Sequence, residues 1–216
     1  RDCLHEELAQ AIGPLNDLYR LNDSVFNDDN IHTILTGFDM LILRTYYAPA
    51  LRNGMSRDEV AARLPGLLAQ FNPRGQGAGG LLTPRTSRLW KASIEEALSD
   101  GTSDSRRRQA AARAIEIGRS QGWTGTRAGF AQYAYGRLQI GNDAGQAIAA
   151  FNAASSAYSQ DPATQIHMAH VALQLAAPAL ISGDADRAIA ITQAAIPVAR
   201  RHENAGLLSL LMMFQA

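Results

Sequence analysis

The sequence lacks several features that define common functional classes. Its single cysteine, Cys3, excludes an internal disulfide and any zinc cluster built from paired cysteines. Lys and Arg together number 20, as do Asp and Glu, so the formal net charge is zero. This balance argues against nucleic acid and against an anionic membrane surface as partners. No run of about 18 apolar residues is present, so we expect no transmembrane helix.

Valine is scarce as well, whereas alanine is abundant. The 216 residues include 38 alanines and only 4 valines. This ratio favours tightly packed helices over sheets, because alanine has the highest helix propensity and β-branched residues favour strands. We therefore expect an all-α fold, with enough chain for one large or two small domains.

Both ends of the sequence suggest a piece of a longer protein. The first residue is Arg1 rather than Met, and an apolar tail runs from Leu207 to Phe214. A natural C-terminus usually ends in polar residues. Since a bare apolar stripe would be an unusual surface, the tail, with Leu211 and Phe214, predicts self-association or continuation into further helices.

A segment rich in glycine and proline divides the chain. It predicts a linker over residues 73–87, between an N-terminal part at 1–72 and a C-terminal part at 88–216. In the N-terminal part, apolar spacing and capping residues predict helices at 1–13, 37–48 and 57–71. The polar stretch from Asp23 to Asn30 lacks the ordered ligand spacing of a calcium loop, so we interpret it as a solvated loop.

The C-terminal part predicts a series of helices joined by short turns, which is typical of α-hairpins. The predicted helices are 86–99, 104–121, 125–141, 143–159, 163–182, 184–202 and 203–216. His167 and His170 share a face of one of these helices. With no carboxylate or cysteine nearby in the sequence, we expect them to be packed or partly exposed rather than ligands.

A weak internal repeat runs through these helices. Ala147, Phe151 and Ala154 follow one glycine turn, and Ala188, Thr192 and Ala195 follow the next at an offset of 41 residues. Small residues at these positions let two helices approach closely. Residues 104–216 thereby resemble tetratricopeptide-like helical repeats. The resemblance implies an array that binds a peptide in a groove, for which we select Tyr133 and Phe151.

The start of the chain carries a second pattern. Glu6, Glu7, Gln10, Gly13 and the pair Asn16 and Asp17 follow the spacing of the metzincin zinc helix, His-Glu-x-x-His-x-x-Gly-x-x-His. Residues four apart share one helical face, so both reach one metal ion. In this register Glu6, Gln10 and Asn16 or Asp17 occupy the ligand positions and Glu7 that of the general base. Because zinc prefers imidazole or thiolate, the ligand set is degenerate.

A larger block strengthens this interpretation. It comprises Glu6–Gly13, Asn16–Asp17, Ser24–Asp28, Thr36–Asp39 and Gly54–Met55. With it, residues 3–71 resemble the C-terminal half of domain-of-unknown-function family 2927, proteobacterial secreted proteins and lipoproteins. The resemblance implies a periplasmic or secreted protein, or one lipid-anchored through a missing N-terminal part. It also implies that Cys3 pairs with a cysteine in that part.

Two functions remain open at this point. We expect a non-catalytic extracytoplasmic scaffold without a cofactor, in which degenerate metzincin-like helices precede an array that binds a protein or peptide. The alternative is an atypical metal-dependent hydrolase or peptidase. There, a divalent metal such as zinc would be held by Glu6, Gln10 and Asn16 or Asp17, with Glu7 as general base.

Overall fold

The computed structural model describes all residues except 1–3, 17, 28, 30, 78–83 and 216, so Cys3 and Asp17 lie outside the described residues. The described chain forms helices and contains no strand, which confirms the predicted all-α fold. The elements are α1 (Leu4–Ala11), η1 (Val25–Asn27), α2 (Gly37–Tyr46), α3 (Arg57–Phe71), η2 (Pro73–Gly75), α4 (Arg88–Leu98), α5 (Asp104–Ser120), α6 (Thr126–Gln139), α7 (Ala144–Tyr158), η3 (Pro162–Thr164), α8 (Gln165–Ile181), α9 (Ala185–Arg201) and α10 (Ala205–Met213).

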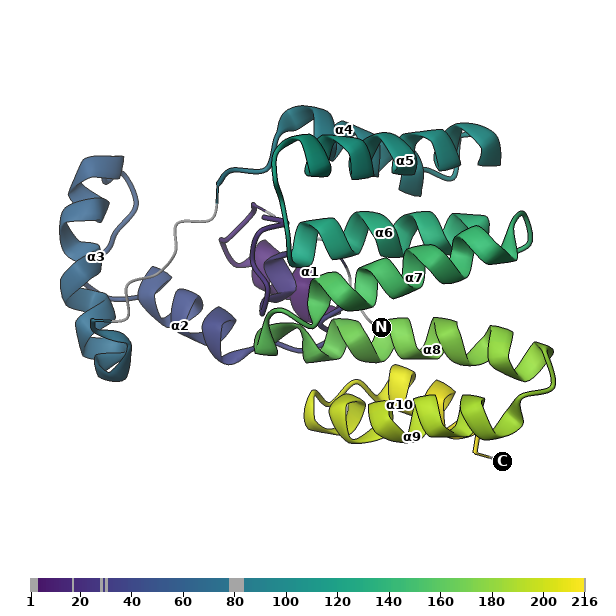
Figure 1. Cartoon of the computed structure of the whole chain (residues 1–216). Coiled ribbons are helices and arrows are strands. Elements are labelled where there is room, and N and C mark those ends of the chain that lie inside the picture. Colours follow the sequence, from purple (N-terminus) through teal and green to yellow (C-terminus); the bar gives the residue numbers. More distant parts are fainter. Residues whose placement is uncertain (1–3, 17, 28, 30, 78–83, 216) are drawn as a thin grey trace.

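Helices α4 to α10 lie in layers, with their axes roughly along one direction (Figure 1). Helix α4 packs on α5, α6 on α7 and α8 on α9, and contacts between α5 and α6 and between α7 and α8 join the pairs. Gly141 and Gly183, both at positive φ, end α6 and α8 as the glycine signals predict. None of the described helices is both long and apolar enough to cross a membrane. The tetratricopeptide-like period stays a prediction.

Two glycines bring α6 into close contact with α7. A Cβ atom built at Gly136 would lie 2.7 Å from Phe151 Cε1, and one at Gly129 would lie 2.7 Å from Tyr158 Cε1. Both rings are fully buried and so have little room to move away. The helices of this pair are close because these two positions carry no side chain.

Replacing Gly136 by alanine should therefore lower the free energy of unfolding by about 1–3 kcal/mol, since the added methyl group overpacks the core. Gly66→Ala is the matched control, because Gly66 lies in α3 with nothing within 4 Å of its Cβ position. That variant should be no less stable than the parent chain. Urea denaturation followed by circular dichroism measures both, and equal midpoints would contradict the predicted overpacking.

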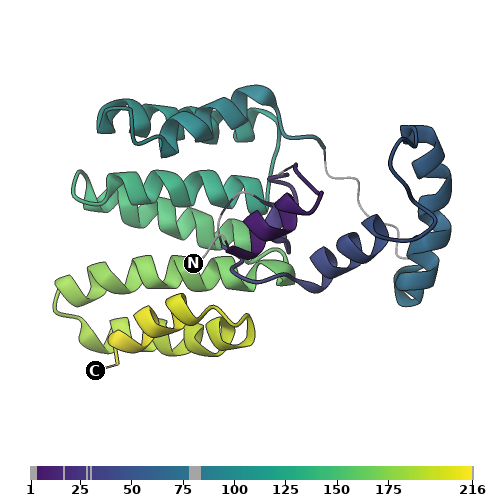
Figure 2. The ribbon, with the colours of Figure 1, turned by 180° about the vertical axis from the view of Figure 1, so that it is seen from behind.

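The loop between α1 and α2 lies across one end of the helical stack (Figures 1 and 2). Tyr19 packs edge-on against Trp90 of α4, with ring centroids 5.1 Å apart. Asn22 donates a hydrogen bond to Asp161 Oδ2 and accepts one from Thr126 Oγ1, both at 2.6 Å. These contacts attach the loop to α4, to the start of α6 and to the connection between α7 and α8.

The prediction of a solvated loop at Asp23–Asn30 is wrong. Ser24, Val25, Phe26, Asn27 and Asp29 are all buried. Further along, Ile31 belongs to an apolar core with residues of α8, α9 and α10. The polar composition is misleading because its side chains bond to protein atoms rather than water; for example, Asn27 donates to the carbonyl oxygen of Leu21.

Helix α3 stands apart from the stack in both views (Figures 1 and 2). It packs mainly on α2 and η2. The predicted capping box is present, with Ser56 Oγ accepting from the Glu59 backbone and the Glu59 carboxylate accepting from Ser56 N. Predicted helix 57–71 is thus observed with the same bounds.

Candidate functional site

Helix α1 carries the residues for which the sequence predicted metal ligands and a catalytic base. Glu6 is buried, Gln10 is half-buried and Glu7 is exposed, while Asn16 is exposed beyond the helix end. Asp17 lies outside the described residues. In the described part of the chain, neither glutamate belongs to a group of three His, Cys, Asp or Glu side chains with converging ligand atoms.

Asp39 in the first turn of α2 holds the buried loop in place. Its Oδ1 accepts from Ser24 Oγ at 2.5 Å, and its Oδ2 accepts from the backbone N–H groups of Val25 at 3.1 Å and Thr36 at 2.8 Å. Thr36 Oγ1 in turn accepts from Asp39 N, which completes a capping box. The segment from Thr36 to Asp39, part of the family-like pattern, therefore caps a helix and fixes the loop before it.

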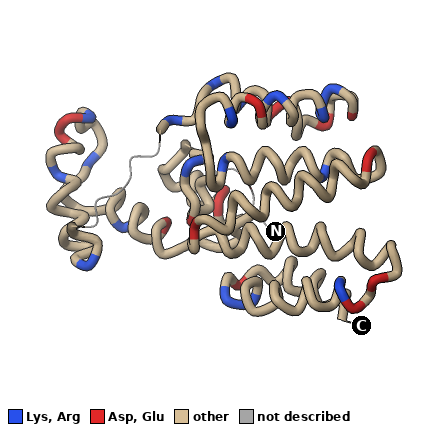
Figure 3. Tube along the Cα trace, viewed as in Figure 1, with Lys and Arg blue, Asp and Glu red and all other residues tan. Residues whose placement is uncertain are grey.

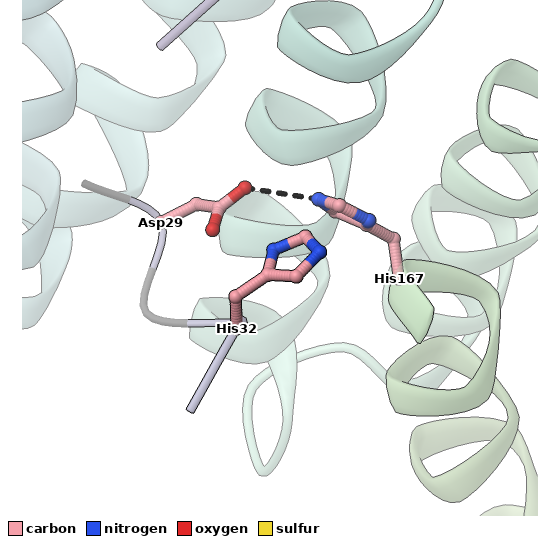
Figure 4. Close-up of side chains that lie close together, drawn as sticks. All are labelled: Asp29, His32 and His167. Atoms are coloured by element: carbon pink, nitrogen blue, oxygen red, sulfur yellow. Dashed lines mark hydrogen bonds and ion pairs between the residues drawn. The ribbon is translucent and has the colours of Figure 1, made fainter. Parts of the chain in front are cut away.

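The loop brings Asp29 and His32 against His167 at the start of α8 (Figure 4). His167 Nε2 lies 3.0 Å from Asp29 Oδ2, and the rings of His32 and His167 are 5.5 Å apart between centroids. One ligand atom from each of the three residues lies within 4.8 Å of the others, and all three residues are buried. We call this the Asp–His–His cluster.

Burial keeps the nearby histidines in their neutral form. Desolvation, and secondarily His167, lowers the pKa of His32, and the same two causes hold the pKa of His170 at about 4. Desolvation also lowers the pKa of His202.

Sequence reasoning missed this cluster. It selected His167 and His170 as a pair but assigned them no carboxylate, because Asp29 lies 138 positions before His167. His167 is completely buried and His170 is half-buried, with its Nε2 atom 3.3 Å from Asn204 Nδ2. No local spacing links residues of a loop to a helix that far along the chain.

A groove of about 670 Å³ lies between the α4–α5 pair and α6. Charged residues of α5 and apolar residues of α4 and α6 line it together, and Asp29 of the cluster also contributes to its wall. The lining residues are Asp29, Leu98, Asp100, Asp104, Arg107, Arg108, Phe130, Tyr133, Ala134, Arg137, Leu138, Ile140, Gly141 and Asn142. Figure 3 shows that charged residues are frequent along α4 and α5, whereas α7 and α8 carry none.

The predicted interaction residues divide between this groove and the core. Tyr133 lines the groove but is only 8% exposed, so its role in binding a partner stays a prediction. Phe151 and Leu211 are fully buried and hence not accessible to a partner. Phe214 is half-buried against an alanine core between α8 and α9. Phe151 and Leu211 are inside because small residues on the facing helices leave room for their side chains.

The described chain is thus an all-α protein with a layered helical stack, a mixed groove and a buried Asp–His–His cluster. Residues 1–66 of the 216 match the model of a family described as a protein of unknown function, DUF2927. This match confirms the resemblance predicted for residues 3–71. No curated protein and no solved structure matches the chain significantly.

Proposed function

We propose that this chain is a non-catalytic interaction protein whose groove binds a peptide segment of a partner protein. The observation that carries the proposal is the groove between the α4–α5 pair and α6, about 670 Å³ in volume, with apolar side chains and both arginines and aspartates along it. Grooves between successive helix pairs are common peptide-binding surfaces in helical arrays.

The side chains of the groove suggest the chemistry of the partner segment. Leu98 and Ile140 are 43% and 59% exposed, so apolar side chains of a partner would remove them from water. Arg107 is paired with Asp104, but within the described residues Arg108 and Arg137 have no ion-pair partner. Arginine without a carboxylate partner favours an acidic residue in the ligand. We therefore propose a segment that combines acidic and apolar residues.

Selection from a random peptide display library on the intact chain tests this proposal. The selected peptides should combine Asp or Glu with large apolar residues, and Arg137→Glu should weaken their binding about tenfold or more, because charge reversal replaces attraction by repulsion. Arg200→Glu is the matched control, since Arg200 is exposed on α9 and outside the groove. Fluorescence anisotropy measures the affinities.

Three results would contradict the proposal: no enriched peptides, peptides of unrelated composition, or equal effects of Arg137→Glu and Arg200→Glu. Affinity that is independent of salt would also argue against an acidic ligand, because the ion pairs of an exposed groove are screened.

Two further parts of the proposal rest on other features. The family resemblance supports a periplasmic or secreted location. Self-association through α10 is supported by Leu210, Met212 and Met213, which are 48%, 51% and 71% exposed. The hydrolase alternative gains no support from the described residues, since Glu7 is exposed and belongs to none of their groups of converging ligand atoms.

A further inference from the structure

We propose that Asp29, His32 and His167 bind one divalent transition-metal ion of the zinc type, which joins the N-terminal loop to the helical stack. The proposal does not depend on the groove or its partner. It also differs from the predicted site on α1, because none of its ligands lies on that helix.

The distances in the cluster are close to those that a metal ion requires. Zinc binds imidazole nitrogen and carboxylate oxygen at about 2.0–2.2 Å in a tetrahedron, which places neighbouring ligand atoms about 3.3 Å apart. His167 Nε2 and Asp29 Oδ2 are already 3.0 Å apart, and all three ligand atoms lie within 4.8 Å of one another. Rotation of the His32 side chain and a small shift of the loop would complete the ligand set.

Unsatisfied polar atoms provide an independent indication of a ligand. His32 Nδ1, His167 Nδ1 and the hydroxyl of Tyr158 are buried without a hydrogen-bond partner among the described residues. His32 Nε2 is buried without a hydrogen bond as well, and only Asp23 Oδ1, at 3.3 Å, lies within ion-pair distance of it. The Tyr158 ring lies 4.9 Å from the His167 ring between centroids. Leaving buried polar atoms unpaired is unfavourable, so proteins rarely gather several in one place unless water or an ion binds there.

The donor set indicates the class of metal. Two imidazole nitrogens and one carboxylate oxygen suit zinc and its neighbours, whereas calcium and magnesium prefer oxygen ligands. Asp23 Oδ1 lies 3.3 Å from His32 Nε2 and would orient the ring from outside the first ligand shell. Three protein ligands leave a fourth position for water or a further ligand.

The positions of the ligands suggest what the metal ion does. Asp29 and His32 belong to the loop, whereas His167 is at the start of α8. An ion held by all three would cross-link segments that are 138 positions apart. Since the unfolded chain cannot hold these ligands together, metal binding should stabilise the folded state.

Zinc and cobalt binding to the tag-free 216-residue chain tests the proposal. We expect one Zn²⁺ per chain by calorimetry and a higher midpoint of thermal unfolding with Zn²⁺ than with EDTA. Co²⁺ should give the visible absorption of a low-coordinate site. His32→Gln and His167→Gln should each weaken Zn²⁺ binding at least about 100-fold.

His202→Gln is the matched control. The His202 ring lies 6.2 Å from that of His32 between centroids, but His202 is not part of the cluster, so this variant should bind Zn²⁺ like the parent. If a ligand variant fails to fold, nuclear magnetic resonance of the parent chain still tests whether His32 and His167 bind the metal ion. Zn²⁺ should then shift the ring signals of His32 and His167 most strongly among the 5 histidines. Absence of stoichiometric Zn²⁺ binding, retained binding in His167→Gln, or loss of binding in His202→Gln would overturn the proposal.

Discussion

Residues 84–216 expressed alone should fail to form the stable helical stack seen in the full chain. The truncation removes Tyr19 from the core around Trp90 and Ile31 from the core around Ile166. Burying each such side chain contributes about 1.5–3 kcal/mol. Together with lost polar contacts, such as those of Asn22, the deficit approaches the roughly 5–15 kcal/mol by which a whole domain is stable. Thermal and urea unfolding would show a broad transition or none.

The control is the 216-residue chain with residues 53–83 replaced by a Gly-Ser linker of equal length. It lacks α3, which packs mainly on α2 and η2, but keeps the loop. This variant should unfold cooperatively. The sequence-based division at 73–87 makes the opposite prediction, namely that residues 88–216 fold as an independent domain. If the truncated chain unfolds sharply, with the same unfolding midpoint as the 216-residue chain, the sequence-based division is supported. Our prediction that residues 84–216 do not fold alone is then contradicted.

Replacing Asp39 by alanine should lower the free energy of unfolding by about 4 kcal/mol, since a fully buried carboxylate that accepts several hydrogen bonds is lost. Two of its donors, Ser24 Oγ and the N–H group of Val25, would remain buried without this acceptor, and the half-buried N–H group of Thr36 would lose it too. The loop that carries Asp29 and His32 would then lose these hydrogen bonds to α2 and keep only its apolar contacts and the bond from Thr36 Oγ1 to the Asp23 carbonyl oxygen. Equilibrium denaturation in urea measures the effect.

Glu59→Ala provides a comparison in the same chain. Glu59 occupies the corresponding position of the capping box of α3, with similar hydrogen bonds to Ser56, but it is exposed to solvent. Water can replace its contacts, so this substitution should cost far less than Asp39→Ala. Asp39→Asn, which keeps one carbonyl acceptor, should fall between the two. Equal losses for Asp39→Ala and Glu59→Ala would refute the structural role assigned to Asp39.

Much of the helical framework was predictable because its signals are local. The helix expected at 104–121 is observed as Asp104–Ser120, and that expected at 184–202 as Ala185–Arg201. Capping residues such as Asp143 and Asp184 bond to backbone N–H groups three positions further on. These interactions act within one turn, so the sequence around each helix end is enough to place it.

The interior of the loop was not predictable from such signals. Asp29 and His32 are polar residues in a turn-rich segment, where exposure is the usual outcome. They are buried because the loop packs against the end of the helical stack. There Asp29 contacts His167, which lies 138 positions further along the chain. The prediction that Phe151 lines a groove was wrong for a related reason. The sequence pattern identifies the face of the helix that carries Phe151, but only the packing of α6 against that face shows that it is covered.

The sequence by itself determined the all-α class, the approximate positions of the helices and the likeness of the first 66 residues to a family of unknown function. The tertiary structure alone decided which side chains meet: the loop and α8 at the Asp–His–His cluster, and α4, α5 and α6 at the groove. The physical reason is the range of the interactions. Hydrogen bonds within a helix turn join near neighbours, whereas burial brings together residues of any separation once the chain is compact.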